Sequence, residues 1–141
     1  MTRIYTLVNQ KGGVGKTTTA INLAAYLAQM GQRILVVDLD PQANATACLG
    51  VDKRAVQGST YEALLNGDVP STSILYNERL QLSLLPSSPS LAGAEVELVD
   101  ESGREFRLRN AIEALDDKFD YILIDCPPSL GLLTVNGLIA A

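Results

Sequence analysis

The stretch Gln10-Lys11-Gly12-Gly13-Val14-Gly15-Lys16-Thr17-Thr18 decides the fold class of this chain. It follows an apolar run at residues 4–8 and precedes an amphipathic run, and this order of strand, glycine-rich loop and helix is what a phosphate-binding loop needs. Glycines allow several backbone N–H groups to point into one hollow, and the following helix directs its positive dipole end at the same anion. Lys16 adds a positive charge for the outer phosphates, and the Thr17 hydroxyl is placed to bind magnesium.

The loop departs from the common pattern Gly-x-x-x-x-Gly-Lys-Thr, because residue 10 is Gln10 and not glycine. A second lysine, Lys11, stands at the entrance of the loop instead. The alternative interpretation is a glycine-rich turn that happens to precede a helix. That alternative leaves Lys16 and Thr17 unexplained, so we interpret the stretch as a nucleotide-binding loop.

The composition favours one globular domain. With 141 residues, of which 47% are hydrophobic, the chain has room for a single domain with a core. It contains no apolar run long enough for a transmembrane helix and no signal-peptide pattern. We therefore expect a cytoplasmic protein that does not bind a membrane.

Residue usage also excludes some chemistry. The chain has no histidine, and Cys48 and Cys126 lack metal-ligand spacing, which excludes histidine acid–base catalysis and the usual zinc sites. The net charge is −5, and no basic cluster provides the electrostatic footprint that nucleic acid requires. We expect no DNA binding from these 141 residues alone.

Apolar runs alternate with segments of helical spacing, which predicts an α/β fold with a mostly parallel β-sheet between layers of helices. The expected strands are residues 3–9, 33–38, 80–85 and 121–125, and the expected helical segments are residues 16–30, 60–65, 91–99, 104–115 and 130–141. The last segment is apolar and ends without a cap, charge or breaker. We expect residues 1–141 to be the N-terminal part of a single domain that is truncated at its C-terminus.

Three aspartates stand where a magnesium site would need them. Asp125 closes an apolar strand, and Pro127 and Pro128 turn the chain away after it. Asp38 and Asp40 end another strand and lie on the same side of the chain. The carboxyl ends of parallel strands meet at one edge of a sheet, so these carboxylates are expected near the loop. Capping or solvated turn residues are the alternative. Beside a phosphate loop, the aspartates predict a site for a divalent cation.

Three ordered motifs resemble those of the ParA/MinD family of ATPases. The loop at residues 10–18 resembles their deviant Walker A motif, and residues 38–46 and 125–131 are similar to their second and third signatures, with Ala43 where many relatives have glycine. Residues 85–88 and 91–95 also resemble the region between them. The resemblance implies a three-layer P-loop NTPase fold, with residues 1–141 forming the first part of one ATPase domain.

The resemblance also implies roles for individual residues. Asp40 would orient the attacking water, Asp38 would support magnesium through water, and Asp125 would hold the outer shell of the metal. Lys11 would reach across a dimer interface to the nucleotide of the partner, and hydrolysis would then loosen the dimer. The residues with implied catalytic roles are Lys11, Lys16 and Asp40, and those implied to bind the metal are Thr17, Asp38 and Asp125. The residues implied to bind the nucleotide are Lys11, Gly12, Gly13, Val14, Gly15, Lys16, Thr17 and Thr18, of which Thr18 would contact the α-phosphate.

The implied function is a magnesium-dependent ATPase that acts as a dimer switch in chromosome or plasmid partitioning. Its expected partners are a second copy when ATP is bound, nonspecific DNA and a ParB-like activator, which would place the full-length protein at the nucleoid. The alternatives are an ATP-dependent synthetase of the cobyrinic acid diamide synthase or dethiobiotin synthetase type, and a MinD-like membrane-cycling regulator. We expect residues 1–141 alone to bind nucleotide weakly or not at all and to be inactive.

Overall fold

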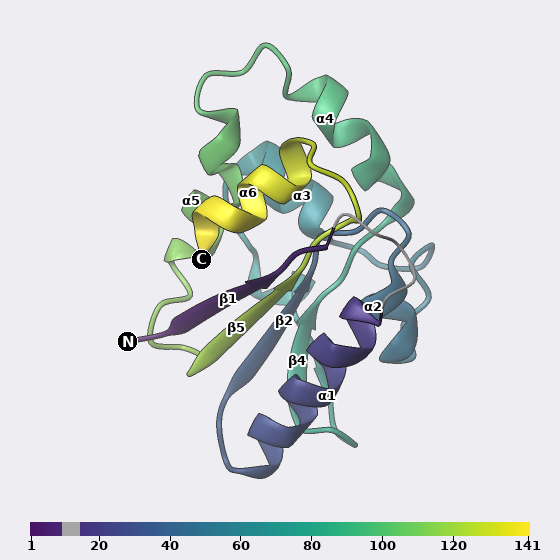
Figure 1. Cartoon of the computed structure of the whole chain (residues 1–141), viewed down its shortest axis with the longest axis vertical. Helices are drawn as coiled ribbons and strands as arrows, with labels where there is room; N and C mark the ends of the chain where they lie inside the picture. The colour runs from purple at the N-terminus through teal and green to yellow at the C-terminus, as the bar shows by residue number, and fades with distance from the viewer. Residues whose placement is uncertain (10–14) are drawn as a thin grey trace.

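The computed structural model describes residues 1–9 and 15–141, which form a sheet with helices on both sides (Figure 1). Short 3₁₀ turns lie at Ser71–Ser73, Pro89–Gly93 and Arg104–Phe106. In chain order the strands and α-helices are β1 (Arg3–Leu7), α1 (Lys16–Gln29), β2 (Ile34–Asp38), α2 (Asn44–Cys48), α3 (Thr60–Asn66), β3 (Leu75–Asn77), β4 (Leu82–Leu85), α4 (Ala94–Glu97), α5 (Arg107–Glu113), β5 (Tyr121–Asp125) and α6 (Leu132–Ala140).

The sheet has the strand order β1-β5-β2-β4-β3, and it is parallel except at one edge. β5 pairs in parallel with both β1 and β2, β2 pairs in parallel with β4, and β3 runs antiparallel to β4. The register places Asp38 at the end of β2 beside Asp125 at the end of β5. This topology confirms the predicted α/β fold with a mostly parallel sheet.

The central strands β2 and β5 carry apolar residues on both faces because each face packs against helices. In β2, Leu35 and Val37 belong to the core under α3, α4, α5 and α6, whereas Ile34 and Val36 belong to the core under α1 and α2. Leu123 of β5 also contributes to the second core. The molecule therefore has three layers, as predicted, and α1 and α2 lie on the face opposite the other helices (Figure 1).

Helix α1 forms because small residues recur along one of its faces. Ala20, Ala24 and Ala28 are buried at intervals of four residues, which brings the helix close to the sheet. The helix ends where Gly31 adopts a left-handed conformation with φ of 85°. The N–H of Gly31 donates to the carbonyl of Ala28 and that of Gln32 to the carbonyl of Leu27, the bonding pattern of a Schellman motif.

Two short elements were not predicted. β3 covers three residues at the sheet edge, and α2 covers five residues directly after the second motif. Neither is long enough to show a periodic pattern in the sequence. α2 also begins after Ala43, which adopts a left-handed conformation with φ of 58° and provides no side-chain cap. Both elements depend on the neighbours that they pack against.

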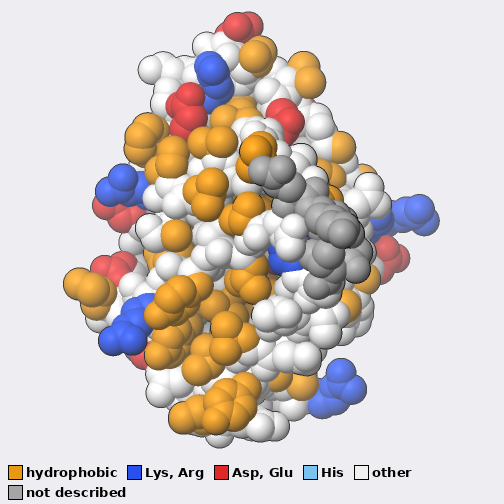
Figure 2. Space-filling view, in the orientation of Figure 1, with side chains coloured by type: hydrophobic (Ala, Val, Ile, Leu, Met, Phe, Trp, Pro, Cys, Tyr) orange, Lys and Arg blue, Asp and Glu red, His pale blue; other side chains and the backbone are white. Residues whose placement is uncertain are grey.

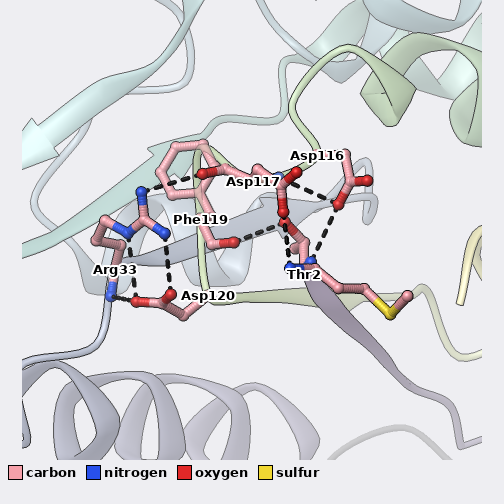
Figure 3. Close-up of polar contacts among 7 residues, drawn as sticks. Thr2, Arg33, Asp116, Asp117, Phe119 and Asp120 are labelled. Atoms are coloured by element: carbon pink, nitrogen blue, oxygen red, sulfur yellow. Dashed lines mark hydrogen bonds and ion pairs between the residues drawn. The ribbon is translucent and has the colours of Figure 1, made fainter.

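Polar contacts join the residues just before β1, β2 and β5, at the end of the sheet where these strands begin (Figure 3). Asp120 accepts hydrogen bonds from the backbone N–H of Arg33 at 2.7 Å and from its Nη2 at 3.0 Å. Thr2 donates its N–H to Asp116 and its hydroxyl to the carbonyl of Phe119. These contacts fix the register at which the three strands begin.

Apolar side chains gather on the face over β1, β5 and α1 (Figure 2). Tyr5, Leu23 and Tyr26 are exposed, and the Tyr5 ring stacks on that of Tyr121 with centroids 6.1 Å apart. Among the described helices, none has the length and apolar character needed to cross a membrane.

Candidate functional site

The site forms where three parallel strands end together. The N–H of Leu39, just after β2, donates to the carbonyl of Asp125 at 2.9 Å, and the N–H of Cys126 donates to the carbonyl of Leu7 at the end of β1. The first turn of α1 contacts the same edge through Lys16. The carboxyl ends of parallel strands are where ligands bind in open α/β sheets.

Asp125 holds the first turn of α1 through both of its carboxylate oxygens. Oδ1 accepts a hydrogen bond within an ion pair from Lys16 Nζ, and Oδ2 accepts one from the Thr17 hydroxyl at 2.7 Å. The Asp125 side chain is fully buried, and that of Lys16 is 11% exposed. The structure thus brings together Lys16, Thr17 and Asp125, which the sequence placed in one site although they are more than 100 residues apart.

Gly15 caps α1 in a conformation that favours glycine. Its φ is 79°, and its carbonyl accepts the first helical hydrogen bond, from the N–H of Thr19. Thr18 lies in the first turn and is exposed. The predicted nucleotide-binding residues Lys11, Gly12, Gly13 and Val14 lie outside the described residues.

Asp38 is fully buried and its carboxylate binds the loop that follows β2. Oδ1 accepts from the N–H of Asp40 at 3.1 Å, and Oδ2 accepts from the N–H and the hydroxyl of Thr46 at 2.9 and 2.7 Å. Burial raises the pKa of Asp38 to about 6, although these hydrogen bonds favour the charged form. Both carboxylate oxygens of Asp38 thus accept hydrogen bonds from the protein. Its support of magnesium through water stays a prediction.

Asp40 lies within electrostatic range of Lys16 and Asp125. Its residue is 3% exposed, and its Oδ1 accepts a hydrogen bond from the N–H of Gln42 at 2.9 Å. Burial raises the pKa of Asp40, whereas the positive charge of Lys16 lowers it and the negative charge of Asp125 raises it further. All three aspartates that the sequence singled out are therefore within electrostatic reach of one another.

Two further buried polar residues lie at this edge, Thr46 and Ser87, and neither was predicted to belong to the site. The Ser87 hydroxyl donates to the carbonyl of Asp40 at 2.7 Å, and the N–H of Ser87 donates to the Thr46 hydroxyl at 3.0 Å. Ser87 follows β4 by two residues, and a polar residue just after an apolar strand was the signal that could have identified it.

The segment after Asp125 is held by α4 and packs tightly on the sheet. The carboxylate of Glu95 accepts a hydrogen bond from the N–H of Leu133 at 3.1 Å and so caps the N-terminus of α6. At Gly137 the helix approaches so closely that an added Cβ would lie 2.4 Å from the sulfur of Cys126. Cys126 is fully buried, and burial raises the pKa of its thiol to about 12, so it is a packing residue.

The donor set suits a magnesium ion that arrives with phosphates. Among residues 1–9 and 15–141, no group of three or more His, Cys, Asp or Glu side chains is arranged to hold a metal. Mg²⁺ binds through one or two carboxylates together with water and substrate phosphates. The hydroxyl of Thr17 beside the carboxylate of Asp125 fits that requirement, and Lys16 supplies the positive charge for an anion.

Comparison with known proteins identifies the family of the chain. The family described as AAA domain matches residues 2–141. The chain is 57% identical over 140 residues to the chromosome partitioning protein ParA of Myxococcus xanthus, an alignment that covers 99% of this chain and 49% of that protein. It is 50% identical over 142 residues to the sporulation initiation inhibitor protein Soj of Bacillus subtilis, covering 100% of this chain and 56% of Soj. The chain thus spans about half the length of these relatives.

Among solved structures, the chain is similar to a cobyrinic acid a,c-diamide synthase from Mycobacterium smegmatis with bound ATP analog and magnesium. The TM-score is 0.96 at 47% sequence identity, and the match covers 100% of this chain and 57% of that one. The likeness includes the whole described fold, so it confirms the predicted three-layer architecture.

Proposed function

We propose, from the premise that this chain belongs to the AAA domain family and has ParA and Soj among its relatives, that it is part of a partition ATPase. In this proposal ATP is the substrate, Mg²⁺ is the cofactor, and hydrolysis times a dimer switch in chromosome or plasmid partitioning. The observation that supports it best is that Asp125 accepts hydrogen bonds from both Lys16 and Thr17 at the start of α1.

Lys16 and Thr17 would bind the triphosphate and its metal. Asp125 neutralises Lys16 and accepts a hydrogen bond from the Thr17 hydroxyl, which keeps both side chains at the N-terminus of α1. Phosphate oxygens then compete with Asp125 for the ammonium group. Magnesium neutralises developing phosphate charge, and Thr17 and Asp125 are the residues that would hold it. Thr18 and residues 11–14 complete the proposed loop.

Asp40 would orient the attacking water. It lies on the loop after β2, close enough to the Lys16–Asp125 pair for both charges to act on its pKa. Burial raises that pKa, which makes the Asp40 carboxylate a stronger proton acceptor than a solvated one. Asp38 contributes by fixing this loop through its hydrogen bonds to Asp40 and Thr46.

The dimer and its partners are part of the same proposal. Lys11 would contact the nucleotide held by a second copy, so that the dimer forms only with ATP and separates after hydrolysis. DNA would bind nonspecifically to the dimer, and a ParB-like protein would stimulate hydrolysis. The relatives named as partition proteins support this assembly.

A second candidate function is an ATP-dependent synthetase. It is favoured by the TM-score of 0.96 with the protein named as a cobyrinic acid a,c-diamide synthase. The higher identity to ParA, 57%, and the presence of Lys11 in the loop favour the partition ATPase. A synthetase would consume ATP only when a carboxylate substrate is added, whereas a partition ATPase would hydrolyse ATP without one.

The test is hydrolysis and dimerisation of the intact protein with ATP and magnesium. We expect slow phosphate release, an ATP-dependent dimer in analytical ultracentrifugation, and an ATP-trapped dimer for Asp40→Ala. Lys16→Ala is expected to abolish nucleotide binding, and Lys11→Ala to abolish dimerisation alone. A Lys11→Ala variant that still dimerises with ATP would contradict the cross-interface role, and phosphate release that requires an added carboxylate would favour the synthetase.

A further inference from the structure

The backbone of Asp40 is held at both of its polar groups by side chains from elsewhere in the chain. Its N–H donates to Oδ1 of Asp38 at 3.1 Å, and its carbonyl accepts from the hydroxyl of Ser87 at 2.7 Å. Asp38 ends β2 and Ser87 follows β4, so the two holding groups come from neighbouring strands of the sheet. The residue proposed to orient water is therefore fixed from both sides.

Thr46 connects these two holding groups. Its hydroxyl donates to Oδ2 of Asp38 at 2.7 Å and accepts from the N–H of Ser87 at 3.0 Å. Its own N–H also donates to Oδ2 of Asp38, at 2.9 Å. We call Asp38, Thr46 and Ser87 the Asp40 clamp.

The clamp is fully buried. Asp38, Thr46 and Ser87 each have a relative exposure of 0%. A second threonine, Thr60, supports it from α3, because its hydroxyl donates to the carbonyl of Asp38 at 2.9 Å. Buried polar networks of this kind favour one arrangement of their members, since a broken hydrogen bond leaves an unsatisfied group in a low-dielectric interior.

We propose that Thr46 and Ser87 are positioning residues for Asp40, which they hold in the orientation needed for hydrolysis. The inference rests on the proposed function, in which Asp40 orients the attacking water. The Thr46 hydroxyl donates to Asp38 and accepts from the N–H of Ser87, and the Ser87 hydroxyl donates to the carbonyl of Asp40. The two hydroxyls therefore act through the loop that carries Asp40 and not on the phosphates.

This arrangement predicts an effect on the rate and not on nucleotide affinity. Lys16 and Thr17 bind the triphosphate in the proposed function, and they are held separately by Asp125. A small displacement of a group that orients a reactant lowers the rate by about one to two orders of magnitude. Loss of an interaction that matters only for the chemical step lowers kcat and leaves KM in place.

Ser87→Ala is the first test. The carbonyl of Asp40 also accepts from the N–H of Ala43 at 2.8 Å, so the variant leaves no orphaned acceptor there and is expected to fold. In the intact protein we expect kcat for ATP hydrolysis to fall about tenfold, while KM changes less than about twofold. The exposed Ser90→Ala is the matched control and is expected to keep the wild-type kcat. An unchanged kcat in Ser87→Ala would overturn the proposal.

Replacement of Thr46 separates the hydroxyl from the volume of the side chain. Thr46→Ser keeps the donor and the acceptor and is expected to stay within about twofold of wild type, whereas the isosteric Thr46→Val is expected to lose at least as much kcat as Ser87→Ala. If Thr46→Ser is as slow as Thr46→Val, the hydroxyl is not the cause and the proposal is wrong.

A measurement without ATP distinguishes failure of the clamp from failure of the proposed function. NMR relaxation of the Asp40 amide should show a lower order parameter in Ser87→Ala than in wild type. If the wild-type protein does not hydrolyse ATP, the proposed function fails, and the clamp is judged by this amide alone. An order parameter that stays at its wild-type value in Ser87→Ala would refute the clamp in either case.

Discussion

The Lys16–Asp125 ion pair should contribute substantially to the stability of the fold. The Asp125 side chain is fully buried, and that of Lys16 is 11% exposed. Removing one partner of a buried pair costs about 3–5 kcal/mol, because the other charge stays in the interior without compensation. For Lys16→Met we expect about 3 kcal/mol, at the lower end, since the Thr17 hydroxyl still donates to Asp125.

The second single variant, Asp125→Asn, keeps an oxygen for Lys16 and Thr17 but loses the charge, so about 2 kcal/mol is expected. The double variant should cost about 3 kcal/mol and not about 5, because neither partner is then left as an unpaired charge. This difference corresponds to a coupling of about 2 kcal/mol between the two side chains.

Urea unfolding followed by far-UV circular dichroism, without nucleotide and with a metal chelator, measures these values. Lys118→Met is the matched control, because Lys118 is exposed, and it should change the free energy of unfolding by less than about 0.5 kcal/mol. Single-variant losses that add up fully in the double variant would show that the two charges do not interact in the folded protein.

Three further predictions concern stability. Burial raises the pKa of Asp38 from 3.8 to about 6. Between these two pH values the folded state holds a proton that the unfolded state has lost. The free energy of unfolding should therefore fall by about 3 kcal/mol as pH rises from about 4 to above 6. Urea midpoints across this range should show a flatter profile for Asp38→Asn, and an equal slope in both proteins would contradict the assignment. Asp120→Asn should lower the urea midpoint, because the hydrogen-bonded ion pair with Arg33 that lowers the pKa of Asp120 is lost, and the loss should shrink in 1 M salt as screening predicts. Gly137→Ala should cost about 1–3 kcal/mol by thermal unfolding, since its Cβ would meet the sulfur of Cys126 at 2.4 Å, and a variant as stable as wild type would show that α6 can shift.

The central strands could be predicted from the sequence because their physical requirement is local. A parallel strand covered on both faces is apolar along its length, and residues 34–37 and 121–124 meet that rule before each strand ends in an aspartate. β3 and α2 could not be predicted in this way, because three or five residues show no period. They form because of tertiary contacts: β3 pairs with β4, and α2 packs in the same core as α1 and β2.

The same contrast holds within the site. The convergence of Lys16, Asp40 and Asp125 was predictable, because parallel strands deliver their ends to one edge. The hydrogen bond that the Thr46 hydroxyl donates to Asp38 was not predictable, because it depends on where the loop returns eight residues later. The contact of Ser87 with Asp40 spans 47 residues and depends on the pairing of β2 with β4.

The register that sets Asp38 beside Asp125 places the two carboxylates at the ends of β2 and β5, each of which has a neighbouring strand on either side. Backbone amides in such strands exchange with solvent deuterium only when the whole domain opens, whereas short surface elements exchange through local fluctuations. The strand ends that carry Asp38 and Asp125 should therefore be as resistant to opening as the whole fold. Any conformational change at the site must then come from the segments that surround Asp38 and Asp125.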